Sequence, residues 1–276
     1  MISWPALGTR VTVRYRRPAG SVPPLTDAVG HLLAVDPVVR VRTKSGVVVE
    51  CGPDDVVALR ALTDAPVRTA EIRSLEHAAA AAHPGVEQMW VDGWLLRAGG
   101  AGLATNSAVP LDVSAGLGAL PAIVDWYGRQ GLPPRLAVPD RLLRLPHPSV
   151  ERTERVLVRA ISAVGHPDPS VTLSPPSVES GLIDGQVMFA NGPGGAVARA
   201  ALTRGPEGTA WVGLSAVRAS DEAAAARACE ALLAWGASRG ATRGYLVADD
   251  GRETAPAAAL GFRLHHRRRY VLADTV

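Results

Sequence analysis

One short pattern occurs twice in the chain: an amphipathic stretch with an internal tryptophan, a glycine that ends it, and a strand-like segment after it. The first copy covers residues 122–131 and the second covers residues 231–240. Apolar residues at helical spacing followed by glycine are typical of a helix and its C-terminus. The segments that follow, at 135–138 and 244–247, read as strands. The pattern therefore favours an α/β arrangement.

The segments upstream of the two expected helices agree as well. Ser107-Ala108-Val109 precedes the first helix at nearly the same offset as Ser215-Ala216-Val217 precedes the second. The shared tryptophan and the similar spacing on both sides favour a duplicated unit. Chance similarity between two helix–glycine–strand segments is the alternative.

The first part of the chain, about 65 residues long, is dominated by short strand-like runs and turn residues. Polar and apolar residues alternate over 9–15, and Lys44-Ser45-Gly46 reads as a tight hairpin between strands at 38–43 and 47–50. The other expected elements are a surface loop over 17–24, a strand over 30–35 and a capped turn over 53–59. Together they predict a small β-barrel. We interpret it as a packing or oligomerisation module, with ligand binding as the alternative.

The C-terminal part reads as three strands joined by glycine-rich turns, followed by a helix and further strands. The expected strands and turns are 186–190, 191–195, 196–202, 205–208 and 211–217. After them we expect a helix over about 223–238, a strand over 245–248, a short helix near 254–260 and a last strand over 264–272. Leu260-Gly261-Phe262 forms the turn before that last strand.

This order of elements, with Leu260-Gly261-Phe262 near its end, resembles the GNAT superfamily of acetyl-CoA-dependent N-acetyltransferases. The likeness covers about residues 170–273, and the upstream unit at 69–140 would be a second, decayed GNAT-like half. The N-terminal segment resembles the Src-homology-3-like barrel at the front of some actinobacterial acetyltransferase-like proteins. The resemblance implies an α+β fold, a small N-terminal β-barrel followed by a GNAT-like mixed α/β sheet. The expected domains are 1–65, 66–165 and 166–276.

The resemblance also implies where acetyl-CoA would bind. In the family, a strand that splays from its neighbour binds the pantetheine arm, and the next helix N-terminus offers backbone N–H groups to the pyrophosphate. The cofactor-binding residues implied here are Leu214, Ser215, Ala216, Val217, Ala223, Ala224, Ala225, Ala226 and Arg227.

Two features depart from the family pattern. Alanines occupy the loop positions at which the family has glycine, and Asp221 and Glu222 bring two acids to the place expected for a polyanion. Acids in a first helical turn also cap its free N–H groups, and Ser220 or Asp221 is a natural N-cap. Ala257 stands where many members have a general-acid tyrosine, since Tyr245 and Tyr270 are expected inside strands.

No general base stands out in the sequence. Glu179, Glu207 and Glu253 each read as solvated surface carboxylates. The catalytic residues therefore stay unassigned. In the upstream unit, Gly116 and Gly118 form a Gly-x-Gly near the start of the expected helix, which is a minor candidate for ligand contact.

We weigh three functions. The first is transfer of acetyl from acetyl-CoA to a primary amine of a small molecule or a protein. The alternative is a non-catalytic GNAT-like protein that binds a ligand or a partner. Association into a homo-oligomer is compatible with either function. Nucleic-acid binding through the arginine-rich barrel and residues 263–269 is disfavoured, because the net charge of +3 is spread along the chain. Only Lys44 of the 29 basic residues is lysine, which we attribute to genomic base composition.

Metal and membrane sites are not expected. Cys51 and Cys229 lie far apart in the sequence and fit no metal-binding spacing. His265 and His266 are adjacent, which would place them on opposite faces of a strand. No uncharged apolar run reaches the ~18 residues of a membrane span, and the N-terminus lacks the features of a signal peptide, so we expect a cytoplasmic protein.

Overall fold

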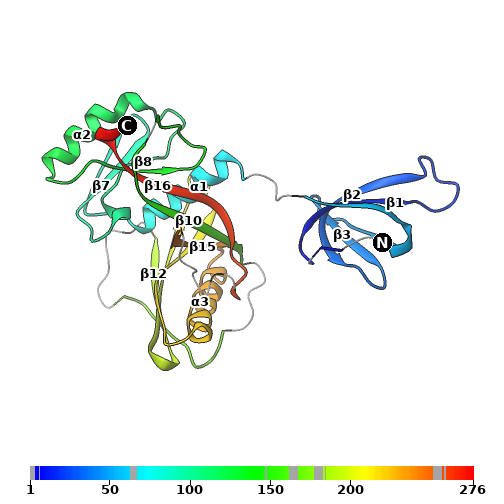
Figure 1. Cartoon of the computed structure of the whole chain (residues 1–276). Helices are drawn as coiled ribbons and strands as arrows, with labels where there is room; N and C mark the ends of the chain where they lie inside the picture. The colour runs from blue at the N-terminus through cyan, green and yellow to red at the C-terminus, as the bar shows by residue number, and fades with distance from the viewer. Residues whose placement is uncertain are drawn as a thin grey trace. The chain divides into compact units, whose positions relative to one another are not determined.

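The computed structural model of the chain describes residues 4–5, 7–62, 67–146, 148–161, 167–176, 183, 185–250, 257 and 259–276. It forms two compact units, residues 1–66 and 67–276, which are described separately below (Figure 1). No helix among the described residues is long and apolar enough to cross a membrane.

The N-terminal unit is a strongly curved antiparallel sheet of five strands in the order β4-β3-β2-β1-β5. The strands are β1 (Arg10–Arg16), β2 (Leu25–Ala34), β3 (Val39–Thr43), β4 (Val48–Cys51) and β5 (Val56–Ala61), with a 3-10 turn at Pro53–Asp55. Val11, Val13, Leu32 and Val41 alternate with exposed residues along their strands and form the core. The small strand-rich N-terminal domain expected from the sequence is confirmed.

The capped turn expected over 53–59 is only partly correct. The turn ends at Asp55, and β5 begins at Val56. The β-branched pair Val56 and Val57 favours an extended backbone, and β5 pairs with β1 along its length. The run is therefore the strand that flanks β1 on the side away from β2.

In the part of the C-terminal unit that the structure describes, three α-helices combine with two sheets. The helices are α1 (Thr69–Ala82), α2 (Leu120–Arg129) and α3 (Glu222–Ala237). The small sheet contains β6 (Glu87–Val91), β7 (Trp94–Ala98) and β8 (Val109–Pro110). The large sheet has the order β11-β12-β13-β14-β15-β10-β16-β9. Its strands are β9 (Arg135–Pro139), β10 (Val150–Ala160), β11 (Thr172–Ser174), β12 (Gln186–Gly192), β13 (Ala196–Arg204), β14 (Ala210–Arg218), β15 (Arg243–Asp249) and β16 (Arg263–Leu272).

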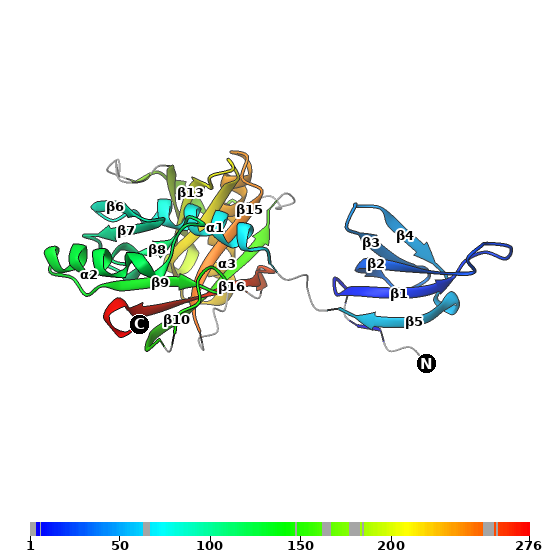
Figure 2. The ribbon, with the colours of Figure 1, turned by 90° about the horizontal axis from the view of Figure 1, so that it is seen from above.

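The two segments that repeat in sequence also share an order of elements. The first is β6-β7-β8-α2-β9 and the second is β12-β13-β14-α3-β15, each with three antiparallel strands, a helix and a strand parallel to the third. A parallel bridge between Ala108 and Leu136 joins the small sheet to β9, and Figure 2 shows β6 to β9 side by side with β16. A common origin of the two segments stays a prediction.

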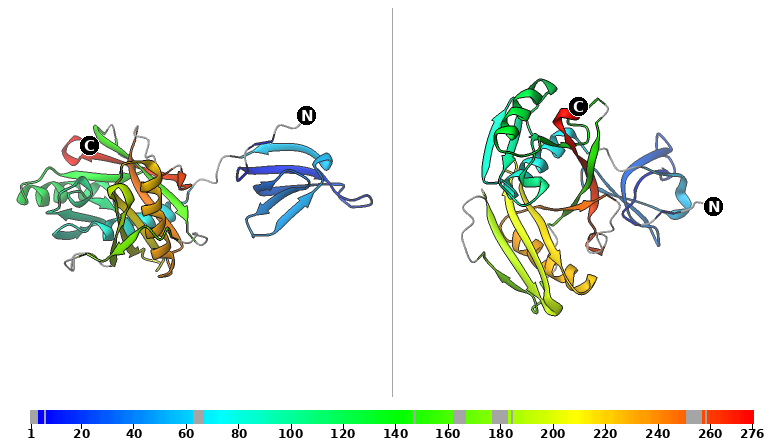
Figure 3. Two further views of the ribbon diagram at one scale, coloured as in Figure 1. Left: turned by 90° about the horizontal axis from the view of Figure 1, so that it is seen from below. Right: turned by 60° about the vertical axis from the view of Figure 1, so that its left-hand side comes forward.

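Two opposite faces of the large sheet are covered by α1 and α3. Leu75 and Ala79 of α1 pack with Trp211 and Tyr245 on one face. On the other face, α3 packs on the alternate residues of the same strands, such as Val212. Figure 3 shows α3, in orange, lying along the sheet. This alternation decides which side chains of β14 and β15 face α1.

The structure places the last expected strand inside the large sheet. β16 lies between β10 and β9. Its neighbour β10 was not anticipated at all. The expected opposite placement of His265 and His266 is also wrong, because a register shift lets their Nδ1 atoms approach to 2.8 Å.

Candidate functional site

Strands β14 and β15 separate partway along their length. They pair in parallel from Trp211 with Arg243 to Leu214 with Leu246, yet β14 continues to Arg218 and β15 to Asp249. Among the residues that the structure describes, the backbone groups of the last residues of β14 therefore have no partner on β15. Ala216, in this stretch, has φ 51°, a left-handed conformation that is costly for a residue with a side chain.

The residues implied by the GNAT resemblance lie on both sides of this separation. Leu214 to Val217 form the diverging half of β14, and Ala223 to Arg227 form the first turns of α3. Leu214 is buried against α3, whereas Ala216 is exposed. Arg227 faces Asp168, with Nε and Oδ2 3.6 Å apart.

The N-terminus of α3 is capped by its own sequence. Asp221 is the N-cap, and its Oδ1 accepts a hydrogen bond of 2.8 Å from the Ala224 N–H, which confirms the capping role expected for Ser220 or Asp221. The bond from the Ala224 N–H lowers the pKa of Asp221, so the carboxylate stays charged at neutral pH. The protein's own anion therefore occupies one of the N–H groups that a pyrophosphate would use.

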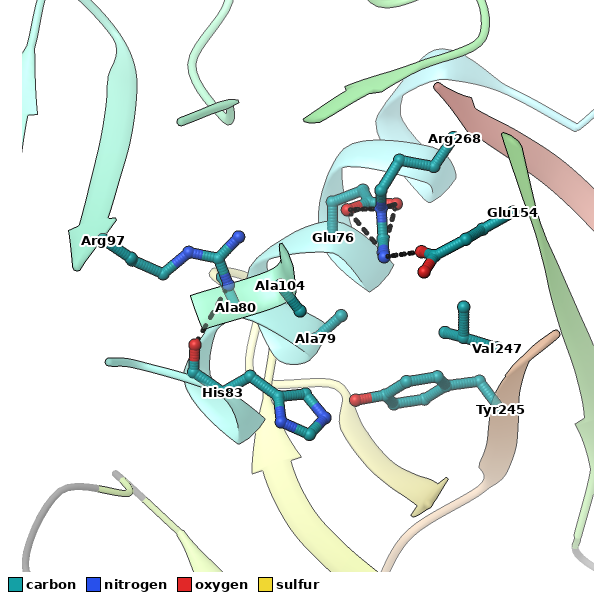
Figure 4. Close-up of a pocket in the computed structure, with 10 residues that line it drawn as sticks. All are labelled: Glu76, Ala79, Ala80, His83, Arg97, Ala104, Glu154, Tyr245, Val247 and Arg268. Atoms are coloured by element: carbon teal, nitrogen blue, oxygen red, sulfur yellow. Dashed lines mark hydrogen bonds and ion pairs between the residues drawn. The ribbon is translucent and has the colours of Figure 1, made fainter. Parts of the chain in front are cut away.

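A cavity lies on the α1 face of the large sheet, next to the last paired residues of β14 and β15. Its volume is about 160 Å³, and its lining comes from α1, β7, β10, β15 and β16 (Figure 4). The lining residues are Glu76, Ala79, Ala80, His83, Arg97, Ala104, Glu154, Tyr245, Val247 and Arg268. None of them was predicted as a site residue.

A buried ion-pair network forms one wall of the cavity. Arg268 donates from Nη2 to both carboxylate oxygens of Glu76 at 2.9 Å and from Nη1 to Glu154 Oε2 at 3.1 Å. His266 Nε2 lies 2.6 Å from Glu76 Oε1, and the Tyr270 hydroxyl donates to Glu154 at 3.1 Å. Burial raises the pKa of Glu76, but the charge of Arg268 and the bond with His266 outweigh it and bring this pKa to about 2.

This network removes Arg268 from any surface patch. Its two flanking arginines are also paired with acids, Arg267 with Asp250 at 3.4 Å and Arg269 with Asp140 at 3.8 Å. The arginine run that suggested nucleic-acid binding is thus largely engaged within the fold.

Tyr245 brings a free hydroxyl to the cavity. Its side chain is 2% exposed, and its hydroxyl has no hydrogen-bond partner among the residues that the structure describes. The ring lies over Gly213, where an added Cβ would be 2.3 Å from the hydroxyl oxygen, so only glycine leaves room for it. Burial raises the pKa of Tyr245, and the phenol is protonated at neutral pH.

His83 and Arg97 lie opposite Tyr245. The Tyr245 hydroxyl points toward the His83 imidazole in Figure 4. Burial lowers the pKa of His83, and the charges of Arg199, Arg97 and Arg268 lower it further, to about 4. Arg97 Nη1 donates to the His83 backbone oxygen at 3.1 Å. The cavity thus holds a protonated phenol facing a neutral imidazole.

The sequence contained one overlooked signal for this cavity. Glu76 follows Ile72 by one helical turn and lies beside Leu75 and Ala79, on the apolar side of α1. A carboxylate on such a face needs a buried partner.

Of the acids considered as bases, Glu207 lies in an exposed turn, while Glu179 and Glu253 lie outside the described residues. Ala257 is buried, with its carbonyl accepting from the Phe262 N–H.

Comparisons with known proteins cover both units. A family model described as "Probable histone acetyltransferase Rv0428c C-terminal" matches residues 69–271, and "Rv0428c N-terminal Sm-like domain" matches residues 5–60. The chain is 59% identical over 298 residues to the probable histone acetyltransferase Rv0428c of Mycobacterium tuberculosis, covering 100% of this chain and 98% of that protein. A solved GCN5-related N-acetyltransferase from Kribbella flavida has a TM-score of 0.49 and 14% identity, covering 71% of this chain and 95% of that one.

Proposed function

The chain belongs to the acetyltransferase family of Rv0428c, and we propose that it transfers the acetyl group of acetyl-CoA to a primary amine. The observation that carries the proposal is the separation of β14 and β15 after Leu214 and Leu246. Unpaired backbone groups beside a cavity suit a thioester, because its carbonyl accepts a hydrogen bond from a backbone N–H.

The cofactor would lie across β14 and α3. We assign the pantetheine arm to the backbone of Ser215 to Val217 and the pyrophosphate to the first turns of α3, Ala223 to Arg227. The α3 N-terminus favours an anion through its dipole and free N–H groups. Asp221 competes for this place, so binding requires its carboxylate to move away from the Ala224 N–H or leaves the affinity low.

The cavity on the α1 face would hold the acceptor amine. The amine nitrogen attacks the thioester carbonyl carbon, a C–N bond forms, and the C–S bond then breaks. In this proposal Tyr245 donates its proton to the leaving thiolate sulfur, and the neutral His83 imidazole accepts the proton lost by the nitrogen. Because Tyr245 points toward His83, the proton can return from the imidazole to the phenolate after each turnover (Figure 4).

The M. tuberculosis relative is named a probable histone acetyltransferase, which makes a lysine side chain of a protein one candidate acceptor. A small-molecule amine is the other. Both donate the same nucleophile, an uncharged primary amine, to the thioester.

One observation favours a second candidate, a non-catalytic member of the family that binds a ligand or partner. The Asp221 carboxylate at the N-terminus of α3 repels a pyrophosphate as well as occupying its donor. If this repulsion prevents acetyl-CoA from binding, the chain has the acetyltransferase fold without acetyl-transfer activity.

Calorimetric titration with acetyl-CoA, followed by a thiol-release assay over a panel of amines, separates the two candidates. We expect a dissociation constant of millimolar or lower, together with thiol release that requires an amine. Asp221→Ser keeps a capping side chain without the charge and serves as a matched variant. Absence of binding and of thiol release in both proteins would rule out the transferase.

A further inference from the structure

Arg97 on β7 is a buried cation on the cavity wall. Arg97 is 4% exposed, and its Nη1 donates a hydrogen bond to the His83 backbone carbonyl. Its Nε is buried without a hydrogen-bond partner, and no carboxylate among the described residues lies within ion-pair distance of the guanidinium. Figure 4 shows the side chain reaching from β7 toward Ala80 and Ala104.

The acids of the cavity are already neutralised. Glu76 is paired with Arg268 and bonded to His266, and Glu154 accepts from Arg268 and Tyr270. Neither carboxylate turns toward Arg97 at bonding distance. Arginine keeps its proton in proteins, so the positive charge of Arg97 remains. A buried charge without a counter-ion destabilises the fold, and a bound anion would offset that cost.

The donor groups at the free edge of the Arg97 guanidinium indicate the chemical class of the ligand. Nη1 donates to the His83 carbonyl, Nε is buried without a partner, and no bond from Nη2 is seen among the described residues, so the free edge consists of Nε and Nη2, a planar pair of donors that matches the two oxygens of a carboxylate. The Tyr245 hydroxyl faces the same cavity without a partner. The volume of about 160 Å³ equals roughly five water molecules in the liquid, which suits a carboxylate with a few attached atoms.

A second cation strengthens the positive potential. Arg199 on β13 is partly buried, and its Nη1 lies 3.3 Å from the Ser215 hydroxyl, on the diverging part of β14. Its charge, like that of Arg97, lowers the pKa of His83. Positive charge from β13 and β7 therefore acts on His83, which lines the cavity.

We propose that the cavity takes an acceptor whose primary amine is accompanied by a carboxylate, an amino-acid-like substrate, and that Arg97 binds this carboxylate through Nε and Nη2. The acetyl-transfer part rests on the proposed function. The carboxylate-binding part does not, because it follows from the charge and burial of Arg97 alone.

The test compares glycine, β-alanine and 4-aminobutyrate with the amide of each, and with a lysine peptide blocked at both ends. Thiol release from acetyl-CoA measures turnover. Ligand-observed NMR with the N-acetylated acids and their N-acetylated amides measures binding without chemistry. For at least one of the three pairs we expect the wild-type chain to prefer the carboxylate at least tenfold in both readouts.

Arg97→Met, which keeps a long side chain without charge, should bring that preference close to one. Arg97→Lys keeps the charge without the planar fork and should give an intermediate preference. If circular dichroism shows that Arg97→Met does not fold, the carboxylate preferences of the wild-type chain and of Arg97→Lys still test the proposal. Arg14→Met, in the N-terminal unit, is the matched control and should leave the preference unchanged.

The outcomes separate the two proposals. Thiol release with amides or the blocked peptide equal to that with carboxylates overturns the carboxylate site and leaves acetyl transfer standing. Carboxylate binding that depends on Arg97, without any acetyl-CoA binding, supports the site and overturns the transferase. A carboxylate preference that survives in Arg97→Met also overturns the assignment of Arg97.

Discussion

Replacing Tyr245 by phenylalanine should stabilise the protein and inactivate it. The hydroxyl is buried without a partner among the described residues, so folding takes it out of water with no bond in return. Such a loss costs about 1–3 kcal/mol. Because the hydroxyl borders a cavity that has room for water, we expect the low end, a gain of about 1 kcal/mol for Tyr245→Phe. In a unit of this size that raises Tm by roughly 2–4 °C.

Tyr270→Phe is the matched control for stability. This ring is also buried, but its hydroxyl donates to Glu154 Oε2 at 3.1 Å. A hydrogen bond to a charged group contributes about 1.5–3 kcal/mol, so Tyr270→Phe should destabilise by about 2 kcal/mol. Urea unfolding followed by circular dichroism measures both variants, and the two shifts should have opposite signs.

The same Tyr245→Phe variant tests the proposed proton donation. General acid catalysis contributes about 10²–10⁴-fold, so kcat should fall at least 100-fold while the calorimetric affinity for acetyl-CoA is unchanged. A loss of stability above about 1 kcal/mol would mean that the hydroxyl has a partner, against the geometry described above. An unchanged kcat would refute the role of Tyr245 as the acid.

Three further predictions concern neighbouring residues. Gly213→Ala would place a Cβ 2.3 Å from the Tyr245 hydroxyl, so we expect a loss of about 1–3 kcal/mol in urea unfolding and a fall in kcat; wild-type values for both would contradict this packing. Asp221→Ser should keep the cap on the Ala224 N–H and change the free energy of unfolding by less than about 0.5 kcal/mol. It should also tighten acetyl-CoA binding several-fold in calorimetry, whereas weaker binding would show that the Asp221 carboxylate favours acetyl-CoA binding. His83 has a folded pKa of about 4, below its unfolded value, so its contribution is full above about pH 6.5 and is lost as the pH falls toward 4. His83→Gln should therefore flatten the dependence of unfolding free energy on pH in that window, and an unaltered slope would argue against a neutral buried imidazole.

The helices and strands that depend on short-range sequence patterns could be predicted from the sequence. The helix expected over about 223–238 and the three strands expected between residues 186 and 217 are confirmed, because helical spacing and glycine turns act over a few residues. The resemblance to the GNAT superfamily is confirmed by the family that the chain belongs to. The cofactor-binding residues implied by that resemblance stay a prediction.

The cavity could not be predicted in the same way. Its network joins Glu76 to Arg268, which are 192 positions apart, so no local spacing reveals the pair. Strand β10 was missed because the charged residues Arg152, Glu154 and Arg155 obscure its apolar alternation, whereas Glu154 is buried against Arg268. Tyr245 was set aside because it is expected in a strand, yet its side chain lines the cavity on the α1 face of the sheet.

The position of β16 has a consequence for how the chain is made. β16 is the last strand that the structure describes, and it hydrogen-bonds to β9 and β10, which are more than 100 residues earlier. During synthesis both earlier strands lack this pairing until β16 has left the ribosome. Arg268 is made only then, so the buried carboxylate of Glu76 has no arginine counter-charge before that moment. Completion of this unit and assembly of its cavity are therefore a single late event of folding.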